Sequence, residues 1–154
     1  MSLLIRRMKL EDVPAVHDID TLSFTLPWSE RSFRYELTEN PVSRGWVAEV
    51  DGQITAMLVL WLIIDEAHIA TIAVHPNFRR QGIGEKILIH ALRAAQDEGA
   101  RRAFLEVRTG NTAAQSMYKK YGFEIVGVRP SYYRDNNEDA FLMNLEKFDC
   151  LETV

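Results

Sequence analysis

The chain has 154 residues, of which 47% are hydrophobic and 26% are charged. This length and composition predict one globular domain over residues 1–154, with enough apolar side chains to fill one core. The formal net charge of −4 argues against a nucleic-acid partner, because nucleic-acid-binding domains usually present a basic face. The longest apolar run, residues 56–64, is far shorter than the roughly 20 residues of a membrane span, so we expect no membrane partner either.

Cysteine usage and the first residues bear on the compartment. Cys150 is the only cysteine, so no disulfide can form within the chain. No cationic, apolar leader precedes residues 3–5. We therefore expect a protein of the reducing cytoplasm.

The first quarter of the chain predicts one strand and two helices. We expect a strand at residues 3–8 and a helix that starts at Glu11-Asp12, whose charges suit a helix N-terminus, and fades near residues 21–24. Ser29 can cap a second helix. Between the helices lies the apolar loop that carries Trp28, which fits two interpretations, a core plug under the loop or a wall of a substrate groove.

The next segment predicts antiparallel pairing. Asp51-Gly52 between apolar runs is a strong hairpin signal, with strands expected at residues 46–50 and 53–64. A further strand at residues 68–74 continues the sheet, and Pro76 ends it because proline cannot donate to a ladder.

An amphipathic helix follows that strand after a short basic turn. Apolar residues recur from Gly84 onward at helical spacing, and Gly99 ends the helix. The repeated residues are Ile87, Leu88, Ala91, Leu92 and Ala95. A strand at residues 103–107 then completes a strand–helix–strand unit, which implies a parallel pair.

The turn between strand and helix reads Arg79-Arg80-Gln81-Gly82-Ile83-Gly84. Unpaired N–H groups at a helix start, the helix dipole and two arginines favour a phosphate there. A Walker loop needs Gly-Lys-Ser/Thr, and the dinucleotide fingerprint needs a third small residue where Ile87 stands, so both of those readings fail. A plain glycine turn with solvated arginines remains the alternative.

The last third predicts a helix at residues 112–120, closed by Gly122, and strands at 123–128 and 140–145. A polar loop at residues 130–138 joins these two strands. All the predicted elements together indicate an α/β fold with a mixed sheet.

Several motifs resemble the GCN5-related N-acetyltransferase (GNAT) family in order and spacing, over nearly the entire chain. They are Arg-x-x-Gly-x-Gly in the turn, Leu105-Glu106-Val107-Arg108, Asn111-x-Ala113-Ala114, Met117-Tyr118 and Tyr121-Gly122-Phe123. Three further segments resemble the RimI-type ribosomal-protein alanine N-acetyltransferases and their archaeal Nα-acetyltransferase relatives. These are Leu26-Pro27-Trp28-Ser29, Tyr132-Tyr133 and Glu138-Asp139-Ala140.

The resemblance implies the GNAT (acyl-CoA N-acyltransferase) fold, a mixed central sheet with helices on both faces, and acetyl-CoA as cosubstrate. It implies that the cofactor is bound by Ile72, Ala73, Val74, Arg79, Arg80, Gln81, Gly82, Ile83, Gly84, Asn111 and Tyr118. It makes Glu106 the general base, acting directly or through a water, and Tyr118 the acid that meets the CoA sulfur. It implies an acceptor groove with Trp28, Glu106, Tyr132 and Tyr133, although Ser131 stands where the RimI pattern often has Asn.

Without the resemblance, the same residues have ordinary interpretations. Strand alternation places Glu106 on one face with Phe104 and Arg108, where it could be a solvent-facing partner of Arg108. Tyr118 could pack its ring on the sheet, and Asn111 could cap a helix.

The implied function is transfer of an acetyl group from acetyl-CoA to a protein or peptide N-terminus, with a ribosomal protein as the implied class of acceptor. Two alternatives remain, an acetyltransferase of a small amine and a non-catalytic acyl-CoA sensor, and the presence of both Glu106 and Tyr118 argues against the sensor. The four histidines, His17, His68, His75 and His90, show no metal spacing, so we expect ordinary histidines and no metal. The sequence leaves the oligomeric state open.

Overall fold

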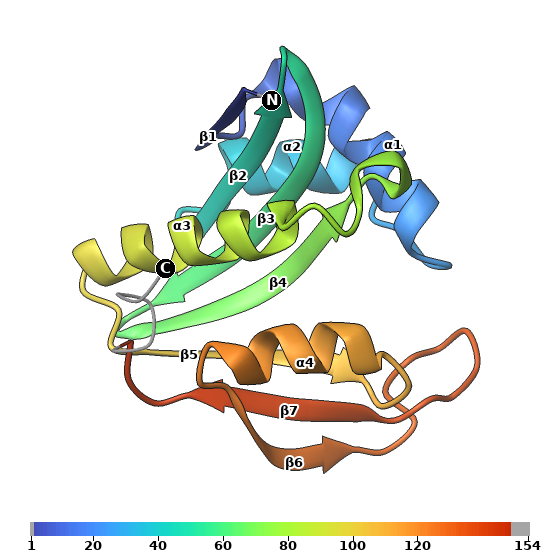
Figure 1. Ribbon diagram of the computed structural model, residues 1–154, viewed down its shortest axis with the longest axis vertical. Coiled ribbons are helices and arrows are strands. Elements are labelled where there is room, and N and C mark those ends of the chain that lie inside the picture. Colours follow the sequence, from blue (N-terminus) through green and yellow to red (C-terminus); the bar gives the residue numbers. More distant parts are fainter. Residues whose placement is uncertain (1, 149–154) are drawn as a thin grey trace.

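The computed structural model describes residues 2–148, and its centre is one seven-stranded sheet (Figure 1). The strands are β1 (Leu3–Arg7), β2 (Ser43–Val50), β3 (Gln53–Ile63), β4 (Glu66–Val74), β5 (Arg102–Arg108), β6 (Glu124–Arg129) and β7 (Ala140–Leu145). They lie in the order β1-β2-β3-β4-β5-β7-β6, and only β4 and β5 run parallel. The predicted mixed α/β architecture is confirmed.

Helices cover both faces of the sheet (Figure 1). They are α1 (Val13–Ser23), α2 (Glu30–Thr38), α3 (Ile83–Asp97) and α4 (Thr112–Lys120). The first two bury Val16, Ile19 and Phe33 against one face, and the last two bury residues such as Ile87 and Tyr118 against the other. Two apolar clusters, one on each face, therefore hold the sheet between the helices.

The turn chemistry of the hairpin is as predicted, and some strand ends differ. Asp51 and Gly52 both have positive φ, 51° and 85°, as the mirror-image turn of a two-residue hairpin requires. β3 ends at Ile63 rather than Ile64, because Ile64 has a φ of 57° and belongs to the turn. β2 and β4 begin three and two residues earlier than predicted, at Ser43 and Glu66, because pairing with their neighbours continues there.

The predicted helix ends are also present. The Ser29 hydroxyl accepts a hydrogen bond from the Ser32 amide at 3.1 Å and so caps α2. Gly99 has a φ of 108°, and the Ala100 amide donates to the Ala95 carbonyl at 2.9 Å. This left-handed closure ends α3 at the predicted glycine.

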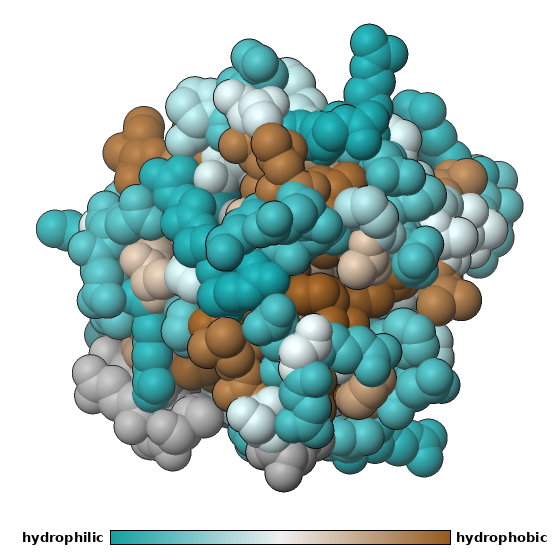
Figure 2. All heavy atoms as spheres, turned by 90° about the horizontal axis from the view of Figure 1, so that it is seen from above, coloured by the Kyte–Doolittle hydropathy of each residue, from teal (hydrophilic) through white to brown (hydrophobic). Residues whose placement is uncertain are grey.

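Hydrophilic side chains cover most of the face that is seen in Figure 2, with apolar groups between them. Within residues 2–148, no helix is long and apolar enough to cross a membrane. Cys150 lies outside the described residues.

Candidate active site

A cleft opens where the two parallel strands separate. β4 and β5 pair at only three positions, from Glu66–Arg102 to His68–Phe104. Beyond these pairs the strands diverge, as Figure 1 shows on the side where α4 lies below β4. The space of about 850 Å³ is lined by both strands, the basic turn, α4 and parts of two loops. The divergence exposes backbone of β4 that an ordinary sheet would pair.

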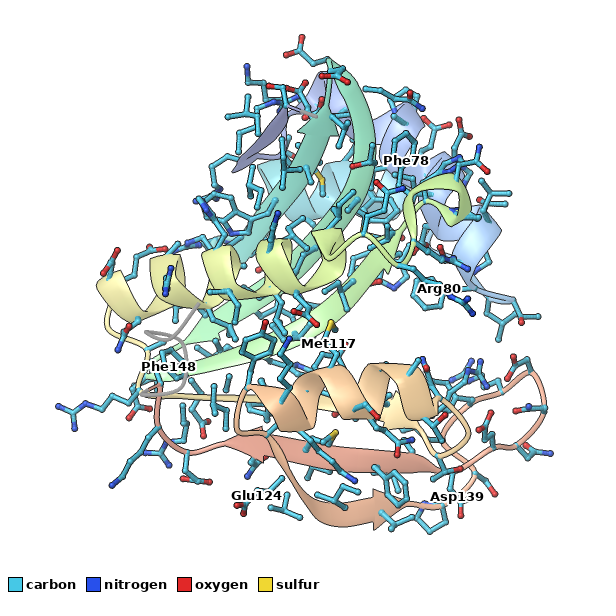
Figure 3. The ribbon with its side chains drawn as sticks, viewed as in Figure 1. Phe78, Arg80, Met117, Glu124, Asp139 and Phe148 are labelled. Atoms are coloured by element: carbon cyan, nitrogen blue, oxygen red, sulfur yellow. The ribbon has the colours of Figure 1, made fainter. Side chains whose placement is uncertain are left out.

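The basic turn forms one wall of this cleft and starts α3. Gly82 has a φ of 78°, and no atom lies within 4 Å of the position that a Cβ would take there. Its carbonyl accepts the first hydrogen bond of the helix, from the Lys86 amide at 3.1 Å, so the amides of the first turn have no partner inside the helix. Arg80 projects at the open side of the cleft (Figure 3).

These features fit a CoA-type ligand. Free amides at a helix start, the positive end of the helix and Arg80 all favour a phosphate group. Arg79 makes hydrogen bonds within the protein. Its guanidinium donates to the Val74 carbonyl at 3.0 Å and to the Ser23 hydroxyl at 3.2 Å. It therefore ties the turn to β4 and α1.

The opposite wall is the face of α4. Asn111 caps this helix by accepting a hydrogen bond from the Ala114 amide at 3.2 Å, so its capping interpretation is confirmed. Met117 points towards α3 (Figure 3), and its Sδ lies 3.8 Å from the position of a Cβ on Gly84. A Cβ would make ordinary van der Waals contact here, so the approach between α3 and α4 leaves room at residue 84 for a small side chain only.

Tyr118 lies deeper on the same wall. Its side chain is buried, with its ring 5.6 Å from that of Phe123, and burial raises the pKa of its hydroxyl. No hydrogen bond of this hydroxyl occurs among the described residues, although the residue lines the cleft. The packing of the ring is thus the ordinary one, while the hydroxyl remains able to meet a ligand as a neutral donor.

Glu106 lies across the cleft on β5 with its side chain 11% exposed. His68 Nε2 lies 2.8 Å from Glu106 Oε2, and Arg129 Nε lies 3.6 Å from Oε1. Because a carboxylate can only accept, the histidine donates this hydrogen bond. The suggested pairing of Glu106 with Arg108 is wrong, because Arg108 contacts the loop before β7 instead.

Two aromatic side chains fix the ring of His68. Phe104 stacks on it at 4.5 Å between centroids, and Trp61 meets it edge-on at 5.3 Å. Burial acts to raise the pKa of Glu106, but the hydrogen bond from His68 and the electrostatic effects of His68 and Arg129 outweigh it and lower the pKa. The cleft therefore holds an ionised carboxylate with a defined orientation.

Aromatic residues flank another part of the cleft. Tyr132 and Tyr133 pack edge to face at 5.0 Å, and both line the cleft. The packing interpretation of Trp28 is confirmed, because its ring packs on Phe33 at 5.2 Å, and the residue also lines the cleft. Its backbone amide donates to buried Asp20 at 2.7 Å.

The structure brings the predicted site residues together with one exception. The predicted catalytic, acceptor and cofactor residues all line the cleft apart from Gln81, which does not belong to its lining. Within the described residues, no group of three His, Cys, Asp or Glu side chains is placed to hold a metal ion.

Sequence reasoning missed His68 and Asp20. The signal for His68 was present, because the predicted parallel pair and strand alternation put it on the same face as Glu106. For Asp20, the signal was a carboxylate one turn after Val16 on the apolar stripe of the first helix.

Comparisons with known proteins agree with this geometry. The family model described as acetyltransferase (GNAT) family matches residues 13–123. A Bacillus subtilis (strain 168) protein, provisionally named ribosomal protein bS18-alanine N-acetyltransferase, is 42% identical over 90% of this chain and 92% of its own length. The Escherichia coli (strain K12) protein of that name is 32% identical over 92% of this chain and 95% of its own length.

Solved structures show the same fold. The crystal structure of the ribosomal-protein-S18-alanine N-acetyltransferase from Escherichia coli superposes with a TM-score of 0.86 at 31% identity. The match covers 94% of this chain and 93% of that one. The chain therefore belongs to the GNAT family of acetyl-CoA-dependent N-acetyltransferases, as a RimI-like member.

Proposed function

We propose that this enzyme acetylates the α-amino group of a protein N-terminus, and that its acceptor class is a ribosomal protein with an N-terminal alanine. The observation that carries the proposal is the ionised Glu106 at the acceptor end of the cleft, near Tyr132 and Tyr133. Relatives that match at least nine-tenths of the chain bear the name of this acceptor, which supports the choice of class. An acceptor of this class implies action in the cytoplasm.

This reaction requires no covalent bond between the protein and the acetyl group. Acetyl-CoA supplies an acetyl group that is already activated as a thioester. In our proposal, Glu106 accepts the proton of the acceptor ammonium, directly or through one water, and His68 holds the carboxylate in place. The Tyr118 hydroxyl holds the proton that the leaving thiolate requires, and the backbone of residues 72–74 with the turn at 79–84 positions the cofactor.

The basicity of Glu106 favours an α-amino group over a lysine side chain as the acceptor. An α-amino group has a pKa of about 7.7 to 8.0, so its free form costs about 1 to 1.4 kcal/mol at pH 7. For a lysine side chain, with a pKa of about 10.4, the cost is about 4.6 kcal/mol. A carboxylate base whose pKa is lowered suits the more acidic ammonium.

A peptide that carries both kinds of amine tests the proposal. We expect the enzyme to acetylate the N-terminal alanine of a short peptide with an internal lysine, as located by fragmentation in a mass spectrometer. The same peptide with a blocked N-terminus is the control and should gain little acetyl group. Acetylation chiefly at lysine, or only of free small amines, would contradict the N-terminal assignment while leaving the acetyltransferase activity intact.

A further inference from the structure

The loop at residues 130–139, between β6 and β7, carries the two tyrosines of the acceptor end. Four of its side chains contact a single residue of β5, Arg108. The guanidinium donates to Asp135 Oδ2 at 2.8 Å, to Glu138 Oε1 at 3.2 Å and to Asn136 Oδ1 at 3.3 Å, and its Cζ lies 4.0 Å from the ring centre of Tyr133. One arginine therefore holds both arms of the loop and one of its aromatic rings.

The backbone of Arg108 is itself fixed. Buried Gln115 of α4 donates its amide to the carbonyls of Arg108 and Thr109, at 2.9 and 3.0 Å. Glu138 also accepts from the Gly110 amide at 2.8 Å through its second oxygen, Oε2. A Cβ on Gly110 would lie 2.8 Å from that same oxygen, so a larger residue there would displace the Glu138 carboxylate from its present position.

The same loop reaches the opposite wall of the acceptor end. Asp135 accepts a hydrogen bond from Thr25, which lies in the segment between α1 and α2. That segment also carries Leu26 and Trp28, which line the cleft. Through Asp135, Arg108 is thus connected to both walls between which an acceptor must enter.

We propose that Arg108 is a positioning residue that sets the affinity for the acceptor by holding Tyr132 and Tyr133 at the mouth of the cleft. This inference rests on the proposed function in so far as the acceptor is a polypeptide terminus. Without Arg108, Asp135 and Glu138 would face each other with no counter-charge, and Tyr133 would lose its cationic partner. Lysine would keep the charge but lacks the planar fork that meets two carboxylates at once.

In this proposal, Arg108 takes no part in the proton transfer at Glu106. Its side chain stands on the same face of β5 as Glu106 but has its own set of carboxylates, while Glu106 is paired with His68 and Arg129. Loss of Arg108 should therefore weaken acceptor binding and leave the proton transfer at Glu106 unchanged.

Steady-state kinetics on three variants test this. In Arg108→Met, we expect KM for an alanine-terminated peptide to rise about 10- to 100-fold, the range that follows when strong binding contacts are lost. We expect kcat, its pH profile and KM for acetyl-CoA to stay close to wild type. Arg108→Lys should recover part of the affinity. Arg102→Met is the matched control, because Arg102 starts the same strand, pairs with Asp65 at 3.3 Å and does not line the cleft.

Proteolysis gives an independent readout of the loop. Arg134 lies in the loop and offers a trypsin site, so Arg108→Met should be cut after Arg134 faster than Arg102→Met, with circular dichroism showing that both are folded. An unchanged peptide KM in Arg108→Met, or a fall in kcat with a shifted pH profile, would overturn the proposal. Absence of any N-terminal product with the wild-type enzyme would overturn the proposed function instead, and the cleavage rates would still show whether Arg108 holds the loop.

Discussion

A carboxylate that is 11% exposed should lose its charge unless something faces it, and Glu106 has two such neighbours. His68 donates a hydrogen bond to one oxygen, and Arg129 lies near the other. His68 cannot swing away, because it lies between the rings of Phe104 and Trp61. At the scale of single residues, the site therefore contains one carboxylate and the groups that keep it ionised and oriented.

Replacing Glu106 by a side chain of the same shape that cannot accept the proton tests its role as general base. We expect Glu106→Gln to lower kcat by about 100- to 10,000-fold, the usual contribution of general acid–base catalysis, with little change in the Kd for acetyl-CoA. Tyr118→Phe should also slow turnover, since it removes the hydroxyl and keeps the packed ring. Glu124→Gln, at an exposed position on β6, is the control and should behave as wild type. Full activity in both site variants would leave the two residues with a structural role.

The partner of the base can be tested through the pH dependence of kcat/KM. His68 lowers the pKa of Glu106 against the effect of burial, so His68→Leu should raise that pKa. The acidic limb of the profile should then move to higher pH, because the base becomes protonated at a higher pH. His68→Gln keeps an N–H donor and should show a smaller shift. Coincident profiles for wild type and His68→Leu would show that another group sets the acidic limb.

At the scale of elements, the cleft follows from the early separation of β4 and β5 and from the glycine turn between β4 and α3. Three paired positions hold the two strands together at one end, and α3 and α4 face each other across the gap that follows. The turn then presents helix N-terminal amides to this gap. We therefore expect binding of the cofactor to depend on backbone that only small residues leave accessible.

Gly84 offers a direct test of that dependence. A Cβ at this position would lie 3.4 Å from Val74 Cγ2, so Gly84→Ala should fold and bind acetyl-CoA. The indole of Gly84→Trp would fill the space towards Met117, and we expect calorimetry to detect no acetyl-CoA binding although circular dichroism is unchanged. Wild-type affinity in the tryptophan variant would place the phosphate-binding amides elsewhere.

Local signals predicted the elements well because the relevant physics is local. Asp51-Gly52, Ser29 and Gly99 each act through their own backbone or that of a near neighbour, and the structure confirms all three. The parallel pairing of β4 with β5 was predicted from the residue pattern, but the side-chain contacts that this pairing creates were not. The pairing of Glu106 with His68 depends on the register of β4 against β5, and these two residues lie 38 positions apart in the sequence.

At the scale of the whole molecule, the sheet separates two apolar clusters, and the cluster under α1 and α2 contains a buried carboxylate. Asp20 is 1% exposed, its Oδ2 accepts from the Trp28 amide at 2.7 Å, and its Oδ1 has no partner among the described residues. Burial raises its pKa to about 6, against the opposing effects of the Trp28 amide and of His17. The segment that carries Trp28 is therefore attached to the core through a carboxyl group whose ionisation lowers the stability of the folded protein.

The sign of this effect is testable in the stability of the whole chain. The folded protein binds the proton of Asp20 more tightly than the unfolded chain does, whose carboxyl has an ordinary pKa near 3.8, so this residue lowers stability as pH rises from about 4 to 6. From these two pKa values, linkage predicts a loss of about 2 kcal/mol between pH 4.5 and 7. Asp20→Asn lacks this titration. The amide atom of Asn that takes the place of Oδ1 would also have no hydrogen-bond partner, and this lowers the free energy of unfolding by an amount that does not change with pH. We therefore expect the free energy of unfolding of Asp20→Asn, measured in urea, to gain about 2 kcal/mol on wild type between those pH values. Parallel stability curves for the two proteins would show that Asp20 is not protonated on folding, and that water or a movement of Trp28 relieves its charge.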